Sequence, residues 1–280
     1  MGFKPAFTAT WLASLLIAVM NPTHAQLDPK LDVPYVPTRE VVVQAMLDVG
    51  QVSSSDLLYD LGSGDGRIVV TAAKERGTRG VGVDLDPQRV REAKANAKQA
   101  GVEDKVTFIE GNLFETDFSK ATVVTMYLLP AVNLQLRPRI LSDLRPGTRI
   151  VSHSFDMGDW QPDQQAQISG SYVYLWIVPA PVAGTWQWRT ADGKDYRLEL
   201  AQQFQQVSGK AWIDGRPAQL QAAELTGDQL RLTVQADDTA APASFSARYI
   251  DGRLVGIPDG AQATAAAQQV VWEKVGGGAG

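Results

Sequence analysis

Apolar and polar residues follow an alternation of strands and amphipathic helices between about residues 38 and 178. The clearest helix begins at Asp86-Pro87, an N-cap followed by proline at the first helical position, and it ends at Gly101. Nearly continuous apolar runs are typical of strands whose two faces are both covered. Such runs lie at residues 57–61, 80–83, 106–109, 121–126, 149–152 and 171–178. The pattern predicts an α/β fold with a mainly parallel sheet.

After Pro179-Ala180-Pro181 the pattern changes to short segments in which apolar and polar residues alternate. Turn signals such as Asp214-Gly215 separate them at hairpin spacing. The segments lie at residues 184–188, 196–200, 209–213, 230–234, 244–249 and 270–273. We predict a C-terminal all-β domain, a small barrel or a sandwich, whose tryptophans belong to its core rather than to a ligand site.

The N-terminal residues 1–25 combine Lys4 with an apolar run from Trp11 to Met20 and small residues before Gln26. The run is short for a membrane-spanning helix and has the form of a secretory signal peptide. We therefore expect an exported protein, in the bacterial periplasm. An uncleaved anchor is the alternative, and only then do we expect contact with a membrane.

Composition narrows the possible partners. The chain has 26 Lys and Arg against 31 Asp and Glu, a formal net charge of −5, and no cluster of basic residues. This balance argues against a protein that holds nucleic acid by its phosphates. The absence of cysteine excludes disulfides, thiolate metal sites and a cysteine nucleophile. We expect no metal site.

The strongest chemical signal is the segment from Asp60 to Arg67, with sequence DLGSGDGR. A strand that ends in an acid and continues into three alternating glycines predicts a tight turn whose backbone approaches a ligand. A dinucleotide site needs its third glycine where Arg67 stands, and the lysine of a phosphate-binding P-loop is missing. The next strand ends in Asp84, where a carboxylate can accept hydrogen bonds from both hydroxyls of a ribose.

This motif resembles the first motif of the class I, seven-strand S-adenosylmethionine-dependent methyltransferases. The sequence PYVPT at residues 34–38, followed by a helix over 39–48 with Thr38 as N-cap, makes the resemblance narrower. Over about residues 33–163 the chain is similar to the mitochondrial lysine methyltransferases of the ATP synthase c-subunit and the adenine nucleotide translocase, and to their bacterial relatives. The resemblance implies a Rossmann-like seven-strand methyltransferase sheet with S-adenosyl-L-methionine as cofactor.

The resemblance also implies roles for individual residues. Asp60 would lie near the ammonium group of the cofactor, and Tyr127 would shape the pocket of the methyl acceptor. His153, the only histidine after residue 25, could take a proton, although we favour a structural role. The implied cofactor-binding residues are Tyr35, Thr38, Asp60, Gly62, Ser63, Gly64, Gly66, Asp84, Asn112 and Leu113.

The sequence thus predicts a methyltransferase domain over residues 26–178, a β accessory domain over 182–274 and a disordered tail over 275–280. The expected reaction is methyl transfer to a nucleophilic acceptor, and the resemblance suggests a protein lysine. A small-molecule acceptor is one alternative. A catalytically inactive exported protein that binds a nucleoside or serves as a scaffold is another.

Overall fold

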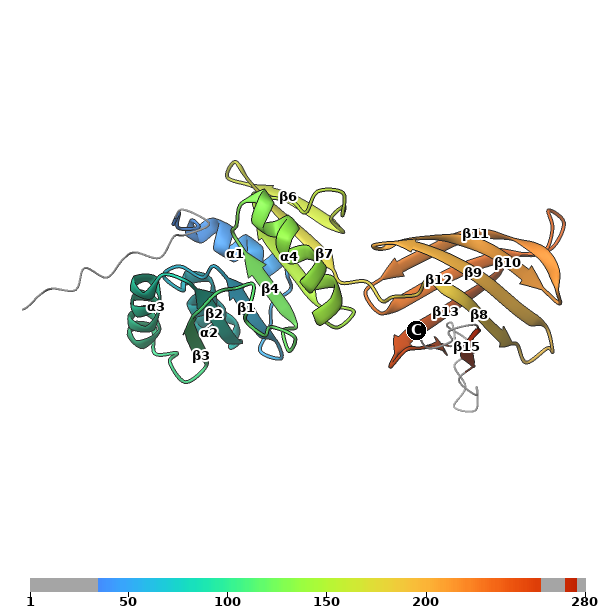
Figure 1. Cartoon of the computed structure of the whole chain (residues 1–280), viewed down its shortest axis with the longest axis horizontal. Coiled ribbons are helices and arrows are strands. Elements are labelled where there is room, and N and C mark those ends of the chain that lie inside the picture. Colours follow the sequence, from blue (N-terminus) through green and yellow to red (C-terminus); the bar gives the residue numbers. More distant parts are fainter. Residues whose placement is uncertain (1–34, 258–269, 276–280) are drawn as a thin grey trace, which may run out of the picture.

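The computed structural model describes residues 35–257 and 270–275. It consists of an α/β unit with a seven-stranded sheet and a closed eight-stranded barrel, which lie side by side (Figure 1). The predicted fold class is confirmed, and the second unit is a barrel rather than a sandwich. The predicted signal peptide lies outside the described residues.

The sheet of the α/β unit has the strand order β3-β2-β1-β4-β5-β7-β6. Its first five strands are parallel, and β7 runs antiparallel to both β5 and β6. The strands are β1 Leu57–Leu61, β2 Arg79–Asp84, β3 Val106–Glu110, β4 Val123–Met126, β5 Arg149–His153, β6 Gln164–Ile168 and β7 Ser171–Ile177. The order reverses between β1 and β4, which is where open α/β sheets bind ligands, at the carboxyl ends of the strands.

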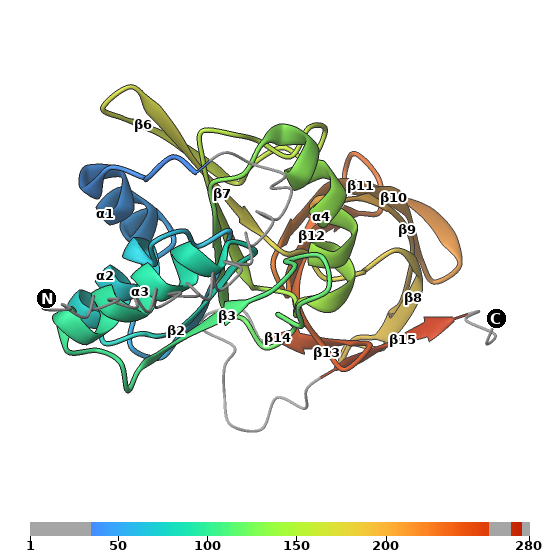
Figure 2. The same cartoon turned by 60° about the vertical axis from the view of Figure 1, so that its left-hand side comes forward.

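Helices cover both faces of this sheet. The helices are α1 Glu40–Val49, α2 Arg67–Arg76, α3 Pro87–Ala100 and α4 Pro130–Asp143. Buried residues of α1, α2 and α3, such as Val43 and Ile68, share one apolar cluster, whereas Leu136 and Ile140 of α4 belong to a second cluster. The sheet is therefore a middle layer between three helices and one helix (Figure 2).

The predicted caps of α3 are confirmed. Asp86 Oδ1 accepts a hydrogen bond from the Gln88 amide at 2.7 Å, and Gly101 ends the helix with a φ of 69°. The predicted start of α1 is wrong by one residue: the N-cap is Arg39, and no side chain caps the helix. The hydroxyl of Thr38 lies 3.2 Å from Nδ1 of His153, so it faces the sheet rather than the first turn of the helix.

The barrel has the cyclic order β8 to β15, closed by the pairing of β15 with β8. Its strands are β8 Gly184–Arg189, β9 Asp195–Gln203, β10 Gln206–Ile213, β11 Arg216–Thr226, β12 Gln229–Gln235, β13 Ala243–Ile250, β14 Arg253–Ile257 and β15 Val271–Val275. Trp186, Trp188 and Trp272 are buried, whereas Trp212 is half-buried beneath the guanidinium of Arg197. Val275 belongs to β15, so placing it in a disordered tail was wrong.

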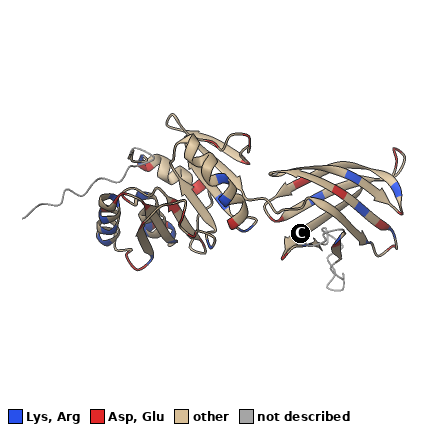
Figure 3. Ribbon diagram, in the orientation of Figure 1, with Lys and Arg blue, Asp and Glu red and all other residues tan. Residues whose placement is uncertain are grey.

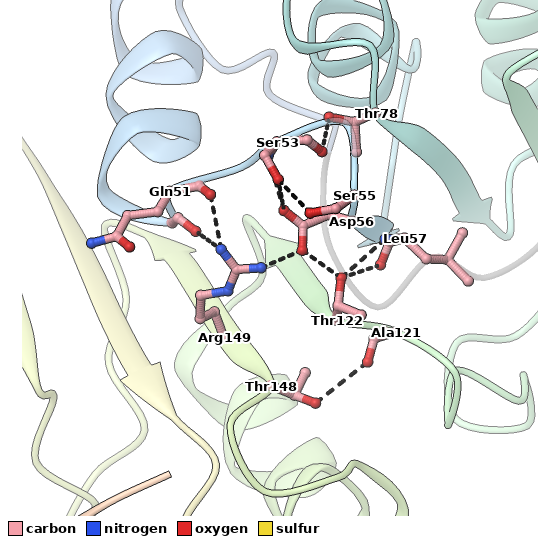
Figure 4. A network of polar contacts seen from close by, with 11 residues as sticks. Gln51, Ser53, Ser55, Asp56, Leu57, Thr78, Ala121, Thr122, Thr148 and Arg149 are labelled. Carbon is pink, nitrogen blue, oxygen red and sulfur yellow. Dashed lines mark hydrogen bonds and ion pairs between the residues drawn. The ribbon is translucent and has the colours of Figure 1, made fainter. Parts of the chain in front are cut away.

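A polar network joins the amino ends of β1, β4 and β5, at the opposite edge of the sheet from their carboxyl ends (Figure 4). Asp56 is 4% exposed and accepts a hydrogen bond from the Thr122 hydroxyl at 2.7 Å. It also forms an ion pair with Arg149, whose guanidinium donates to the carbonyls of Gly50 and Gln51. Three neighbouring strands are thereby fixed at the same end.

Charged residues of both signs are intermixed on the helices and along the barrel strands (Figure 3). Across residues 35–257 and 270–275, none of the helices combines the length and the apolar character needed to cross a membrane.

Candidate active site

The glycine-rich loop between β1 and α2 folds back onto the end of β2. The amides of Gly62 and Ser63 both donate to the carbonyl of Val83, each at 2.9 Å. Gly62, Gly64 and Gly66 have φ values of 78°, 53° and 76°. Side chains are disfavoured in this left-handed region, so the turn depends on its glycines.

Close packing adds to this requirement at two of the glycines. A Cβ at Gly64 would lie 2.6 Å from Cε2 of Tyr35, and one at Gly62 would lie 2.7 Å from Cδ2 of Leu128. Both distances are far below a normal van der Waals contact. The loop backbone is therefore covered directly by Tyr35 and Leu128.

Asp84 at the end of β2 holds the loop in place. Its Oδ2 accepts a hydrogen bond from the Gly64 amide at 2.7 Å, and its Oδ1 accepts one from the Asp86 amide at 2.9 Å. Each carboxylate oxygen keeps a lone pair for a further donor. The geometry leaves Asp84 able to accept from sugar hydroxyls while it fixes the shape of the turn.

Asp60 at the end of β1 is 2% exposed, and its Oδ1 accepts a hydrogen bond from the Thr125 hydroxyl at 2.7 Å. Burial raises the pKa of its carboxyl group to about 7; the Thr125 hydrogen bond opposes this shift, and the negative charges of Asp84 and Asp65 add to it. An ammonium group beside Asp60 would favour its ionised form. The site thus contains a buried acid whose negative charge a cationic ligand would balance.

One pocket collects most of the predicted site residues. Its lining includes Tyr35, Thr38, Asp60, Gly62, Ser63, Gly64, Asp84, Asn112, Leu113 and Tyr127. Gly66 does not line it: a Cβ there would lie 2.6 Å from the ring of Phe108 and 2.8 Å from Cβ of Ala93, so this glycine permits close packing of α2 and α3 on the sheet. The assigned roles of the lining residues stay predictions.

Sequence reasoning missed three charged residues that fasten the segment covering the pocket. Arg67 Nη1 donates to the Thr38 carbonyl at 2.9 Å and pairs with Asp65 at 2.6 Å. The guanidinium of Arg89 lies 4.4 Å from the ring centre of Tyr35. The only signal in the sequence was the arginine that replaces the third glycine of a dinucleotide motif.

An aromatic group forms the side of the pocket next to β4 and β5. Tyr127 follows β4 and lines the pocket, and its ring centre lies 3.8 Å from that of His153 and 6.0 Å from that of Phe155. His153 is 4% exposed and does not line the pocket, and burial lowers its pKa to about 4. It is therefore a neutral packing partner of Tyr127 in this structure.

Within the described ranges, 35–257 and 270–275, no group of three or more His, Cys, Asp or Glu side chains is arranged to hold a metal ion. The pocket instead offers the buried acid Asp60, the acid Asp84 at the end of β2 and the apolar side chains of Leu85, Leu113 and Leu128. These groups fit an amino acid joined to an adenine nucleoside. Fold and site together define a class I S-adenosylmethionine-dependent methyltransferase.

Comparison with known proteins supports this class. Residues 60–164 match the family model of the ANTKMT methyltransferase domain. A protein-lysine N-methyltransferase of Saccharolobus islandicus is 46% identical over 151 residues, which are 52% of this chain and 94% of that protein. The Xenopus laevis lysine N-methyltransferase of the ATP synthase c-subunit is 34% identical, over 53% of this chain and 65% of the frog enzyme.

A solved structure supports the same class of methyltransferase. An RNA methyltransferase of Salinibacter ruber in complex with S-adenosyl-L-homocysteine is 54% identical, with a TM-score of 0.52 over 52% of this chain and 96% of that one. The chain therefore belongs to the family that includes the protein-lysine N-methyltransferase of Saccharolobus islandicus, and it is an S-adenosylmethionine-dependent enzyme.

Proposed function

We propose that the enzyme methylates the side-chain amine of a lysine in a protein. The observation that carries the proposal is the 46% identity to a protein-lysine N-methyltransferase, across 94% of that relative. The pocket supports it, because the ring of Tyr127 lines the wall next to β4 and offers an aromatic contact to the side chain of a lysine. An RNA acceptor is the second candidate, favoured by the description of the Salinibacter ruber relative.

Methyl transfer depends more on the alignment of nucleophile, methyl group and sulfur, and on the exclusion of water, than on acid-base groups. Bound S-adenosylmethionine would supply a methyl group that a nucleophile attacks in line, so that the methyl–sulfur bond breaks and S-adenosylhomocysteine leaves. A lysine must lose its proton before it can attack, and a desolvated position beside Tyr127 would lower the pKa of its ammonium. The rings of His153 and Phe155 lie next to that of Tyr127, so they support an aromatic residue of the pocket wall beside which the lysine side chain would lie.

Isotope labelling tests the acceptor. The purified chain is incubated with S-adenosylmethionine carrying a tritiated methyl group and with an extract of its source cells, treated either with ribonuclease or with protease. We expect label that survives ribonuclease and appears as methyllysine after acid hydrolysis. Asp84→Ala serves as the inactive control. Label confined to methylated nucleosides would overturn the lysine proposal and favour RNA.

We propose further that the protein is exported and that its N-terminal segment is removed. Support comes from the sequence of residues 1–25, with its short apolar run and small residues before Gln26. Cell fractionation and N-terminal sequencing test this: periplasmic protein that begins at Gln26 is expected. A membrane-bound protein with an intact N-terminus would instead support the anchor.

A further inference from the structure

A hairpin of the barrel makes one of the contacts between the two units; a second barrel turn approaches at Gly227, where a Cβ would lie 3.0 Å from Cα of Gly147. The turn between β9 and β10 contains Phe204 and Gln205, and the ring of Phe204 stacks on Trp160 with 5.7 Å between ring centres. Gln205 accepts a hydrogen bond from Trp160 Nε1 at 3.0 Å and donates one to the Gln161 carbonyl at 2.7 Å. The contact is thus both apolar and directional.

Trp160 belongs to the loop that follows β5, over residues 154–163. The α/β unit holds this loop from its other side, because Asn133 donates to the carbonyls of Phe155 and Asp156 and Arg137 donates to that of Met157. The guanidinium of Arg137 also lies 5.2 Å from the ring centre of Phe204. The loop is therefore clamped between α4 and the barrel hairpin.

The same loop reaches the acceptor side of the pocket. Phe155, near its start, stacks on Tyr127 with an angle of 18° between the ring planes. A shift of the loop would move Phe155 and remove support from Tyr127. A continuous set of contacts therefore links the barrel to the pocket wall formed by Tyr127, which lies apart from the glycine-rich loop.

The backbone of the hairpin indicates that the aromatic ring matters there. Phe204 has a φ of 55°, a left-handed conformation that is uncommon for a bulky residue and natural for glycine. The side chain that occupies this strained position is the one that stacks on Trp160. Strain of this kind persists where surrounding contacts hold it.

From these contacts we propose that the barrel is a positioning device for the acceptor side of the methyltransferase site, acting through Phe204 and Gln205 on loop 154–163. The term acceptor side rests on the proposed function. We expect cofactor binding to change little when the clamp is weakened, because the residues predicted for the cofactor lie on β1, β2, β3 and their loops and on the segment before α1.

The test compares the full chain with Phe204→Gly, Phe204→Tyr and Gln205→Ala by hydrogen exchange and calorimetry. Phe204→Gly removes the ring while it relieves the backbone, so the barrel strands should exchange no faster than before. We expect amides of residues 154–163 to exchange about tenfold faster in Phe204→Gly, about threefold faster in Gln205→Ala and at the normal rate in Phe204→Tyr. Affinity for S-adenosylhomocysteine should stay within about twofold.

Turnover supplies the functional readout, with the extract protein of the labelling experiment as acceptor. In Phe204→Gly the extract concentration that gives half-maximal labelling should rise about threefold, with a smaller change in the maximal rate. Unchanged exchange of residues 154–163 in both Phe204→Gly and Gln205→Ala would overturn the proposal, as would equally faster exchange in the glycine-rich loop. Exchange and calorimetry use no acceptor, so they stand apart from the lysine proposal.

Discussion

At the scale of single residues, Asp60 connects pH to cofactor affinity. Its pKa is raised to about 7, whereas a cationic ligand group beside it requires the ionised form. Affinity for S-adenosylmethionine should therefore rise with pH up to about 7, by about tenfold per unit well below that value, and level off above it. Calorimetry in buffers of different ionisation enthalpy should show a proton released on binding near pH 6. A pH-independent affinity would contradict this role.

The same residue should make the ligand-free protein less stable at high pH. Between the unfolded pKa near 3.9 and the folded value near 7, the folded state binds more protons than the unfolded state, so stability falls as pH rises through this window. Asp60→Asn should therefore raise the free energy of unfolding at pH 8, on the order of 2 kcal/mol, while it weakens cofactor binding. Urea unfolding at pH 5 and pH 8 measures the difference, which should be clearly smaller at pH 5 than at pH 8.

Asp84 is expected to affect binding more than folding. Asp84→Ala removes the acceptor of the Gly64 and Asp86 amides together with the expected ribose contact. Affinity for S-adenosylmethionine and S-adenosylhomocysteine should fall at least about tenfold, or about 1.4 kcal/mol. Calorimetric titration measures it, with NAD as a ligand expected not to bind. Tight binding that survives the substitution would exclude the proposed ribose contact.

Sequence reasoning located the acids of the pocket because they follow buried strands, whose carboxyl ends meet at one edge of a parallel sheet. It could not find the pairing of Arg67 with Asp65 or the packing of Arg89 on Tyr35. Those contacts depend on how the segment before α1 crosses the loop, and no local pattern records that path. Thr38 shows the same limit, since a good N-cap residue is used instead for a contact with His153.

At the scale of elements, a substitution in the glycine-rich loop should also displace the segment before α1, which carries Tyr35. Gly64→Ala adds a methyl group 2.6 Å from the Tyr35 ring in a backbone with φ of 53°. We expect a loss of stability of about 1–2 kcal/mol from the backbone, together with weaker cofactor binding because Tyr35 is displaced. Gly101→Ala is the matched control, with φ of 69° and no atom near its Cβ position. The Gly101→Ala variant should lose a similar amount of stability, while its affinity for the cofactor stays unchanged.

The network around Asp56 should stabilise the opposite edge of the sheet. Burial would raise the pKa of Asp56, but hydrogen bonds from Thr122 and Ser53 and the charge of Arg149 outweigh it, so the pKa is lowered. Its contribution to stability is therefore present above the unfolded pKa near 3.9 and is lost as pH falls through the folded value.

Asp56→Ala should cost about 2–3 kcal/mol at pH 7, because Arg149 and Thr122 lose their shared partner. Denaturant titration measures the cost, and it should shrink when the pH is taken below 3. Affinity for S-adenosylhomocysteine should not change, since the network lies at the amino ends of the strands. An equal cost at both pH values would show that charge plays no part.

Three strands were not predicted from the sequence, for related reasons. β6 has the sequence QQAQI and lies at the sheet edge, where little apolar surface is needed. β11 is mostly exposed, and an irregular register between Leu220 and Ala222 interrupts its alternation. β14 contains Gly256 and lies between two better marked strands. Strands that bury few side chains leave weak patterns.

At the scale of the whole molecule, the sequence predicted both units but not how the second one closes. A barrel and a sandwich share the same alternation, and the choice depends on the pairing of β15 with β8. The contact between the units was equally hidden. Phe204 and Gln205 lie in a turn with no motif, and their partners Trp160 and Gln161 are more than forty positions away.

The pairing of β15 with β8, which closes the barrel, also sets the order in which the two units can acquire their structure. β8 comes first in the second unit, and its partner β15 becomes available only after all the intervening strands. Until then β8 and the growing meander have unpaired edges, which favour misassembly and the recruitment of chaperones. The α/β unit meets no such delay, because all its strands precede β8. Newly made molecules would thus acquire the cofactor pocket before the barrel can complete the clamp on residues 154–163.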